Sequence, residues 1–179
     1  MLDWSDIDTV LFDMDGTLLD LHFDNYFWES LVPQNWATKL GIPQDEAWAR
    51  LSAKYHELHG KLDWYCIDYW TRTLQLDIRE LKHDSRDRIR IRPNVEAFLQ
   101  RLQQQNKKLV LVTNAHPDSL ALKMQVTGLA GYFAATISSH ELGRAKENPG
   151  FWTHLQSREF YEPDRSALFD DNLQVLKQA

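Results

Sequence analysis

Two acidic residues near the N-terminus are spaced so that they could carry out phosphoryl transfer. Asp13 and Asp15 follow the apolar run 9–12 and precede Gly16 and Thr17. Carboxylates two residues apart on an extended backbone point to the same side. A carboxylate can attack phosphorus and form an acyl phosphate, so Asp13 is a candidate nucleophile. Asp15 could protonate the leaving oxygen and later deprotonate water.

A second acidic pair follows a later apolar run. Asp170 and Asp171 come directly after residues 166–169. Together with Asp13 they offer the hard oxygen ligands that Mg²⁺ prefers. A metal there would screen the repulsion between a carboxylate nucleophile and a phosphate dianion. The sequence therefore predicts a magnesium site, although acidic residues at the start of a helix are an alternative explanation for the pair.

Three further residues could hold the phosphate. Thr113 offers a hydroxyl and Asn114 an amide after the run 109–112, and Lys146 offers an ammonium in a later loop. Phosphoryl transfer requires donors and positive charge around the transferring oxygens. Taken alone, Thr113–Asn114 is typical of a turn and Lys146 of a surface lysine.

The elements that must position these residues are strands alternating with helices. Strands are predicted at 9–12, 109–112, 135–138 and 166–169, and helices from Pro93, over 118–126 with Asp118 as a candidate cap, over 149–157 and from Asn172. This alternation predicts an α/β fold with a Rossmann-like parallel sheet. Ligands of such sheets bind beyond the carboxyl ends of the strands, where the polar residues lie.

A helical insert is predicted between the first and second strands. Apolar residues recur at helical spacing over 44–59, and a second helix is expected over 64–74. The stretch from 23 to 83 holds five of the seven tryptophans, at positions 28, 36, 48, 64 and 70. We expect a core formed by residues 1–20 and 90–179 and an α-helical cap formed by residues 21–89. Most of the cap aromatics are expected to pack in its interior.

The ordered motifs resemble those of the haloacid dehalogenase superfamily. Residues 13–18 are similar to its first motif, 112–114 to its second, Lys146 to its third and 169–171 to its fourth. The resemblance implies a nucleophile at Asp13, an acid/base at Asp15 and phosphate contacts from Thr113 and Lys146. It also implies Mg²⁺ at Asp13, Asp170 or Asp171, with the Asp15 carbonyl as a further ligand.

A narrower resemblance concerns the substrate. Residues 19–28, 64–70 and 113–117 are similar to the bacterial GMP/IMP nucleotidase branch of the superfamily, which implies a purine nucleotide as substrate. Aromatic residues in the cap could stack on a base. His116 lies beside the second motif and could touch the substrate.

Several alternatives remain open. Glu147 stands where many relatives have proline, which argues against the commonest sugar-phosphate branches, but a sugar phosphate or phosphoglycolate phosphatase is still possible. A haloacid dehalogenase is disfavoured because those enzymes lack a second aspartate in the first motif. A non-catalytic binding protein that kept the fold is the rival from another class.

The amino-acid composition limits the kinds of binding partner and the cellular compartment to be expected. A net charge of −6 without a basic run disfavours nucleic acid polymers and membrane surfaces. The acidic N-terminus is unlike a signal peptide, and the single cysteine, Cys66, fits a reducing compartment. A cytoplasmic enzyme is expected, with its oligomeric state open. The chain ends eight residues after Asp171, whereas the resembled core has a further strand, so the C-terminal part of that core is expected to be missing.

Overall fold

A four-stranded parallel sheet forms the centre of the core. The structure is a computed structural model that describes residues 3–179. The strands lie in the order β3-β2-β1-β4, with β1 at Thr9–Phe12, β2 at Lys108–Thr113, β3 at Ala135–Ser138 and β4 at Ser166–Phe169. Phe12 lies opposite Leu111 on one side and Phe169 on the other. The residues that follow β1, β2 and β4 therefore emerge at the same edge of the sheet, as predicted.

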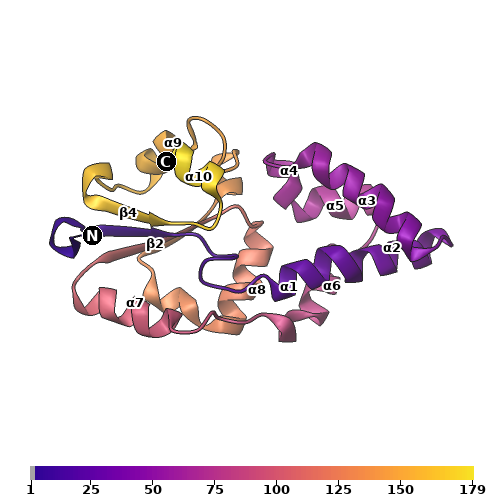
Figure 1. The fold of residues 1–179 in the computed structure, drawn as a ribbon, viewed down its shortest axis with the longest axis horizontal. Helices are drawn as coiled ribbons and strands as arrows, with labels where there is room; N and C mark the ends of the chain where they lie inside the picture. Colours follow the sequence, from indigo (N-terminus) through magenta and orange to yellow (C-terminus); the bar gives the residue numbers. More distant parts are fainter. Residues whose placement is uncertain (1–2) are drawn as a thin grey trace.

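Helices cover both faces of this sheet (Figure 1). Helices α7 (Val95–Gln104) and α8 (Pro117–Thr127) lie on one face and α9 (Phe151–Arg158) and α10 (Leu173–Gln178) on the other. Alternate residues of the strands feed two hydrophobic cores: Phe12 and Leu111 pack toward α7 and α8, whereas Leu11 and Val110 pack toward α9 and α10. This arrangement confirms the predicted α/β class.

The helical module, residues 22–84, extends from one end of the core (Figure 1). It contains the α-helices α1 (His22–Tyr26), α2 (Val32–Leu40), α3 (Gln44–Leu58), α4 (Leu62–Tyr65), α5 (Ile67–Leu74) and α6 (Ile78–Asp84), with a π-helical segment at Phe27–Leu31. Its own hydrophobic cluster is built around Tyr55 and Trp70, and Trp70 is fully buried. The division into a core of 1–20 and 90–179 and a cap of 21–89 stays a prediction, and residues 1–2 lie outside the described part.

Four predictions about helix bounds and caps were wrong. The helix expected over 64–74 is split into α4 and α5, because the backbone of Cys66 is extended (φ −85°, ψ 110°). Helix α8 is capped by the His116 side chain rather than by Asp118. Helix α7 begins at Val95, because Asn94 adopts a left-handed conformation (φ 67°) after Pro93.

Helix α9 also begins later than expected, at Phe151, because Gly150 precedes it with φ 88°. Among residues 3–179, none of the helices is both long and apolar enough to cross a membrane.

Candidate active site

A buried lysine joins the ends of β1 and β4. Lys146 Nζ lies 2.5 Å from Asp13 Oδ1 and 2.7 Å from Asp170 Oδ2, and it also donates to the carbonyl of Val112 at 3.1 Å. The backbone N–H of Asp13 donates to Phe169 O at 2.8 Å, which fixes the tip of β1 against β4. We call Asp13, Lys146 and Asp170 the core lysine cluster. Its position confirms that Lys146 is not a surface lysine, since only 2% of it is exposed.

Burial and ion pairing act in opposite directions on the pKa values of the core lysine cluster. Burial raises the pKa of Asp13 to about 7, although the Lys146 ammonium opposes the shift; the charges of Asp170 and Asp15 add to it. For Lys146, burial favours the neutral amine, but the two carboxylates outweigh it and raise its pKa. Lys146 is therefore a cation at neutral pH.

Asp171 lies beside the loop that follows β1. Gly16 has φ 84°, and a Cβ atom there would fall 2.0 Å from Asp171 Oδ2. Only glycine permits both this backbone conformation and this close approach. One oxygen from each of Asp13, Asp170 and Asp171 lies within 4.8 Å of the others. A set of three carboxylate oxygens fits a hard divalent cation such as Mg²⁺.

A second buried lysine pairs with the other carboxylate of the first motif. Lys123 Nζ in α8 donates to Asp15 Oδ1 and to Asp24 Oδ2, both at 2.6 Å. Lys82 Nζ of α6 lies 3.5 Å from Asp24 Oδ1. We call Asp15, Asp24, Lys82 and Lys123 the bridging lysine cluster, because Asp15 and Lys123 belong to the core whereas Asp24 and Lys82 belong to the helical module.

The bridging lysine cluster also shifts protonation equilibria. Burial raises the pKa of Asp15, with Lys123 opposing and Asp24 reinforcing the shift. Burial acts in the same direction on Asp24, but the Lys123 and Lys82 ammoniums prevail and lower its pKa. Burial lowers the pKa of Lys82 to about 8. A raised pKa suits Asp15 to the role of a proton donor.

The residues after β2 are held by a glutamate. Asn114 Nδ2 donates to Glu147 Oε2 at 2.9 Å, and Asn114 Oδ1 accepts from the Lys146 backbone N–H at 2.9 Å. Tyr65 of the helical module donates to Glu147 Oε1 at 2.7 Å. Both ends of the Asn114 amide thus have protein partners, and its predicted contact with phosphate stays a prediction, as does that of Thr113. Glu147, which departs from the resembled third motif, thus accepts hydrogen bonds both from the helical module and from the second motif.

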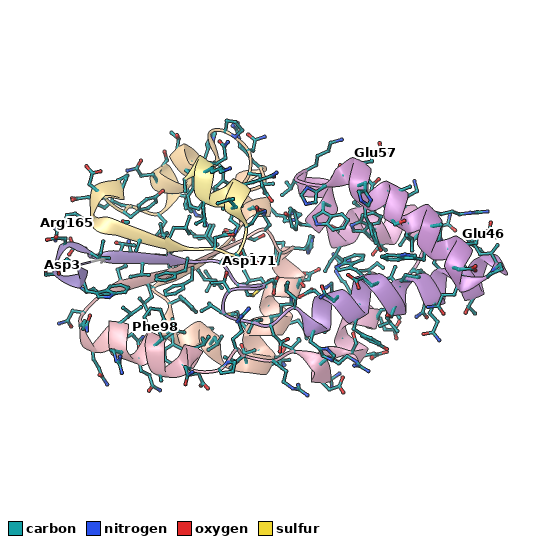
Figure 2. The ribbon with its side chains drawn as sticks, viewed as in Figure 1. Asp3, Glu46, Glu57, Phe98, Arg165 and Asp171 are labelled. Atoms are coloured by element: carbon teal, nitrogen blue, oxygen red, sulfur yellow. The ribbon has the colours of Figure 1, made fainter. Side chains whose placement is uncertain are left out.

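A cavity of about 330 Å³ opens between the strand ends and the helical module, within the size range of small-molecule sites. All seven residues predicted for the site line it: Asp13, Asp15, Thr113, Asn114, Lys146, Asp170 and Asp171. Its other side carries aromatic residues of the helical module: Trp28, Trp48, Tyr55, Trp64 and Tyr65. Figure 2 shows Asp171 at the end of the sheet that faces this module. The sequence did not predict the participation of Asp24, Lys82, Lys123 or Glu147.

Known proteins are similar to this chain over a region that includes the whole candidate site. The model of the haloacid dehalogenase-like hydrolase family matches residues 7–176, a span that contains every residue of the cavity. Over 176 residues the chain is 40% identical to the GMP/IMP nucleotidase YrfG of Escherichia coli (strain K12), covering 98% of this chain and 79% of that protein.

Solved structures share the fold. A HAD phosphatase from Thermococcus onnurineus superposes with a TM-score of 0.83 at 25% identity, over 96% of this chain and 83% of that one. CbbY from Rhodobacter sphaeroides, solved in complex with phosphate, gives a TM-score of 0.70 over 96% of this chain and 81% of that one. Its identity of 15% supports a likeness of fold alone.

Proposed function

This chain belongs to the haloacid dehalogenase-like hydrolase family, and on that premise we propose that it is a magnesium-dependent phosphomonoester hydrolase with Asp13 as nucleophile. The observation that carries the proposal is the meeting of Asp13, Asp170 and Lys146 at the strand edge beside the cavity. An arrangement of this kind offers a carboxylate oxygen to phosphorus and positive charge to the phosphoryl oxygens.

The reaction is proposed to run in two steps. In the first, Asp13 forms a bond to phosphorus while the bond to the ester oxygen breaks, and Asp15 gives that oxygen its proton. In the second, Asp15 takes a proton from water, whose oxygen attacks phosphorus and releases phosphate and the Asp13 carboxylate. A Mg²⁺ ion held by Asp13, Asp170 and Asp171 would screen the charges of carboxylate and phosphate. Lys146 would hold positive charge beside the phosphoryl oxygens.

The helical module is proposed to exclude water and to select the substrate. Its aromatic residues face the strand ends across the cavity, and aromatic rings stack on nucleobases with about 1–3 kcal/mol per base. The relative that is 40% identical is a GMP/IMP nucleotidase. We therefore propose a purine 5′-nucleotide such as GMP or IMP as substrate, and the cytoplasm as the place of action.

A panel of phosphate esters tests this proposal. Phosphate release with Mg²⁺ is measured for GMP, IMP, CMP, glucose 6-phosphate, phosphoglycolate and an aryl phosphate. We expect the highest kcat/KM for the purine nucleotides and no release after chelation of the metal. A preference for phosphoglycolate or the sugar phosphate would contradict the substrate, and no release from any ester would favour a non-catalytic binding protein.

A single substitution separates base recognition from chemistry. Trp48 lines the cavity and is 38% exposed. Replacing it by alanine should raise the KM for GMP by about 5–150-fold, as expected for the loss of one stacking contact. The KM for the aryl phosphate should change less, because the phosphoryl site is untouched. Equal changes for both substrates would argue against base stacking at this residue.

A further inference from the structure

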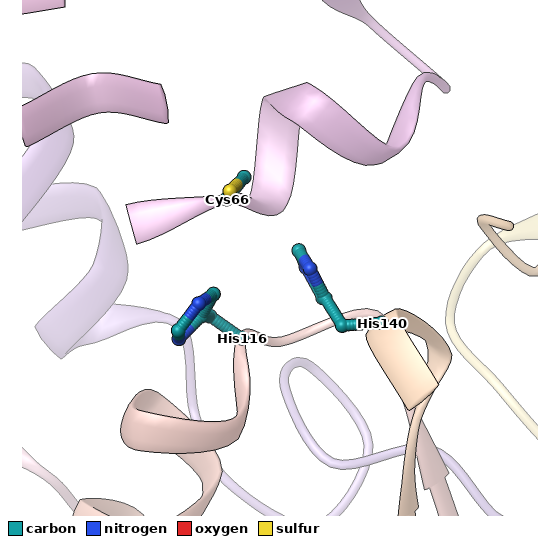
Figure 3. Close-up of side chains that lie close together, drawn as sticks. All are labelled: Cys66, His116 and His140. Carbon is teal, nitrogen blue, oxygen red and sulfur yellow. The ribbon is translucent and has the colours of Figure 1, made fainter. Parts of the chain in front are cut away.

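A cysteine and two histidines meet near the cavity (Figure 3). One ligand atom from each of Cys66, His116 and His140 lies within 4.8 Å of the others. The ring centroids of His116 and His140 are 5.0 Å apart. Cys66 comes from the junction of α4 and α5, whereas His116 precedes α8 and His140 follows β3. Residues from the helical module and from the core thus face one point.

His140 carries a nitrogen that the described protein leaves unused. Its Nε2 atom is buried and has no hydrogen-bond partner among residues 3–179. A buried nitrogen without a partner is unfavourable, and a ligand bound at Nε2 would remove that cost. Neutral imidazole is the form that binds metals.

Both nitrogens of His116 have carboxylates nearby. Nε2 lies 3.6 Å from Asp68 Oδ2, and Nδ1 lies 3.7 Å from Asp118 Oδ2. Nδ1 accepts the α8 capping hydrogen bond from Asp118 N at 3.3 Å, so metal binding through either nitrogen would replace that bond, and the other nitrogen could then donate its proton to a carboxylate. This pairing of carboxylate and histidine orients the ring and increases its basicity in metal sites.

We propose that Cys66, His116 and His140 bind a thiophilic divalent cation, with Zn²⁺ as the best match. Thiolate and imidazole ligands are those of protein zinc sites, and they differ from the carboxylates that suit Mg²⁺. Binding would convert the Cys66 thiol to a thiolate and release its proton to solvent. Three protein ligands leave one tetrahedral position for water or another ligand.

The site would connect the helical module to the core. Tetrahedral zinc holds such ligand atoms about 3.3–3.6 Å apart, as follows from its bond lengths. The three ligand atoms already lie within 4.8 Å of one another, so a bound metal would tie the α4–α5 junction to the loops after β2 and β3. His116 also lines the cavity, and an occupied site would hold the two sides of its mouth together.

Cobalt titration tests the proposal with a direct spectroscopic signal. Co²⁺ is added to the full chain in excess Mg²⁺, which occupies the carboxylate site. Because Cys66 is the only cysteine, a near-ultraviolet thiolate-to-cobalt band reports this residue alone. We expect the band to saturate at one equivalent, and Zn²⁺ to displace it. The absence of the band would overturn the proposal.

Variants show whether the three residues act together. Cys66→Ser should abolish the band while keeping the α5 cap, since serine also accepts the hydrogen bond that Sγ accepts from Tyr69 N. His140→Ala should weaken cobalt binding by more than the roughly 10–100-fold typical of an outer-shell change. The exposed His154→Ala is the matched control and should bind as the wild type does. Equal affinity of His140→Ala and wild type would overturn the site.

A measurement on the wild-type chain avoids any dependence on folding of the variants. Alkylation of Cys66 by iodoacetamide should slow at least about tenfold when Zn²⁺ is added in excess Mg²⁺, because a coordinated thiolate is shielded. An unchanged alkylation rate would contradict the proposal.

Discussion

The two buried lysine clusters are built alike but belong to different parts of the molecule. In each, one ammonium lies between two carboxylates, and each includes one aspartate of the first motif. The core lysine cluster is held by strand ends and their loops alone. The bridging lysine cluster depends on Asp24 and Lys82 of the helical module. The ion pairs of Asp13, the proposed nucleophile, are thus set by the strand edge, whereas those of Asp15, the proposed acid/base, depend on where the module lies.

This difference suggests how the module could act on the reaction. Burial raises the pKa of Asp15, Lys123 opposes the shift and Asp24 adds to it. If the module moved away, Asp24 would leave and Lys123 would stabilise the Asp15 carboxylate more strongly. We therefore expect Asp15 to be a better proton donor when the module is closed on the core. The ion pairs of Asp13 and Asp170 with Lys146 would stay in place during the same motion, and the pKa of Asp13 would change through the charge of Asp15 and through its burial.

The largest expected effects separate the two aspartates. Asp13→Asn should lower turnover by at least about 10³-fold, because no covalent intermediate can form. Asp15→Asn should cost about 10²–10⁴-fold with GMP. With an aryl phosphate the first step needs no proton donor, so Asp15→Asn should accumulate phosphoenzyme in a quenched-flow experiment. Equal burst amplitudes for the two variants would contradict the division of roles.

Removing each lysine should give distinct kinetic defects. Lys146→Met leaves Asp13 and Asp170 without their cation and should slow formation of the phosphoenzyme. Lys123→Met leaves Asp15 beside Asp24, raises the pKa of Asp15 further and should slow breakdown of the phosphoenzyme at neutral pH. Single-turnover rates for both steps check this prediction.

Stability provides a check on the same pair. Lys146→Met leaves the buried Asp13 and Asp170 carboxylates unpaired and should lower the free energy of unfolding by about 3–5 kcal/mol. Lys123→Met should lower it less, because Asp15 and Asp24 are partly exposed and Asp24 keeps Lys82. The exposed Lys177→Met is the matched control and should be neutral. In the single-turnover experiment, slowing of the same step by Lys146→Met and Lys123→Met would contradict the proposed difference between the clusters.

A smaller effect concerns the pH dependence of stability. Burial lowers the pKa of Lys82 to about 8 in the folded chain, against the ordinary value of 10.5 for a lysine. Below pH 8 the wild type keeps a buried cation whose pKa is depressed, which is unfavourable. As pH rises from 8 to 10.5 the folded state loses this proton first, so the wild type should gain stability relative to Lys82→Met.

The expected gain is about 1–3 kcal/mol, as the difference in pKa allows. It is measured by urea unfolding of both proteins at pH 7.5 and 10. A constant difference in the free energy of unfolding between the two proteins would show that Lys82 titrates normally.

Sequence patterns predicted the core better than the contacts across the cavity. Runs of apolar residues placed β3 and β4 at their observed bounds, and parallel strands necessarily bring Asp13, Thr113 and Asp170 to one edge. Lys123 and Asp24 could not be found in this way, because their ion pair joins residues 99 positions apart. No local periodicity encodes such a pair.

The helical module shows the same limitation. Helical spacing of apolar residues continues through Cys66, so the break between α4 and α5 left no signal in the pattern. Glu147 was noticeable only as a departure from the resembled motif. Its hydrogen bonds to Tyr65 and Asn114 give that departure a structural reason.

The most direct test of the account is to identify the residue that carries the phosphoryl group. The enzyme is quenched with acid during turnover of GMP with Mg²⁺ and reduced with borohydride, which converts an aspartyl phosphate to homoserine. Peptide mass spectrometry should then find homoserine at position 13 and aspartate at positions 15 and 170. Homoserine at another aspartate, or none in an enzyme that is turning over, would contradict the account.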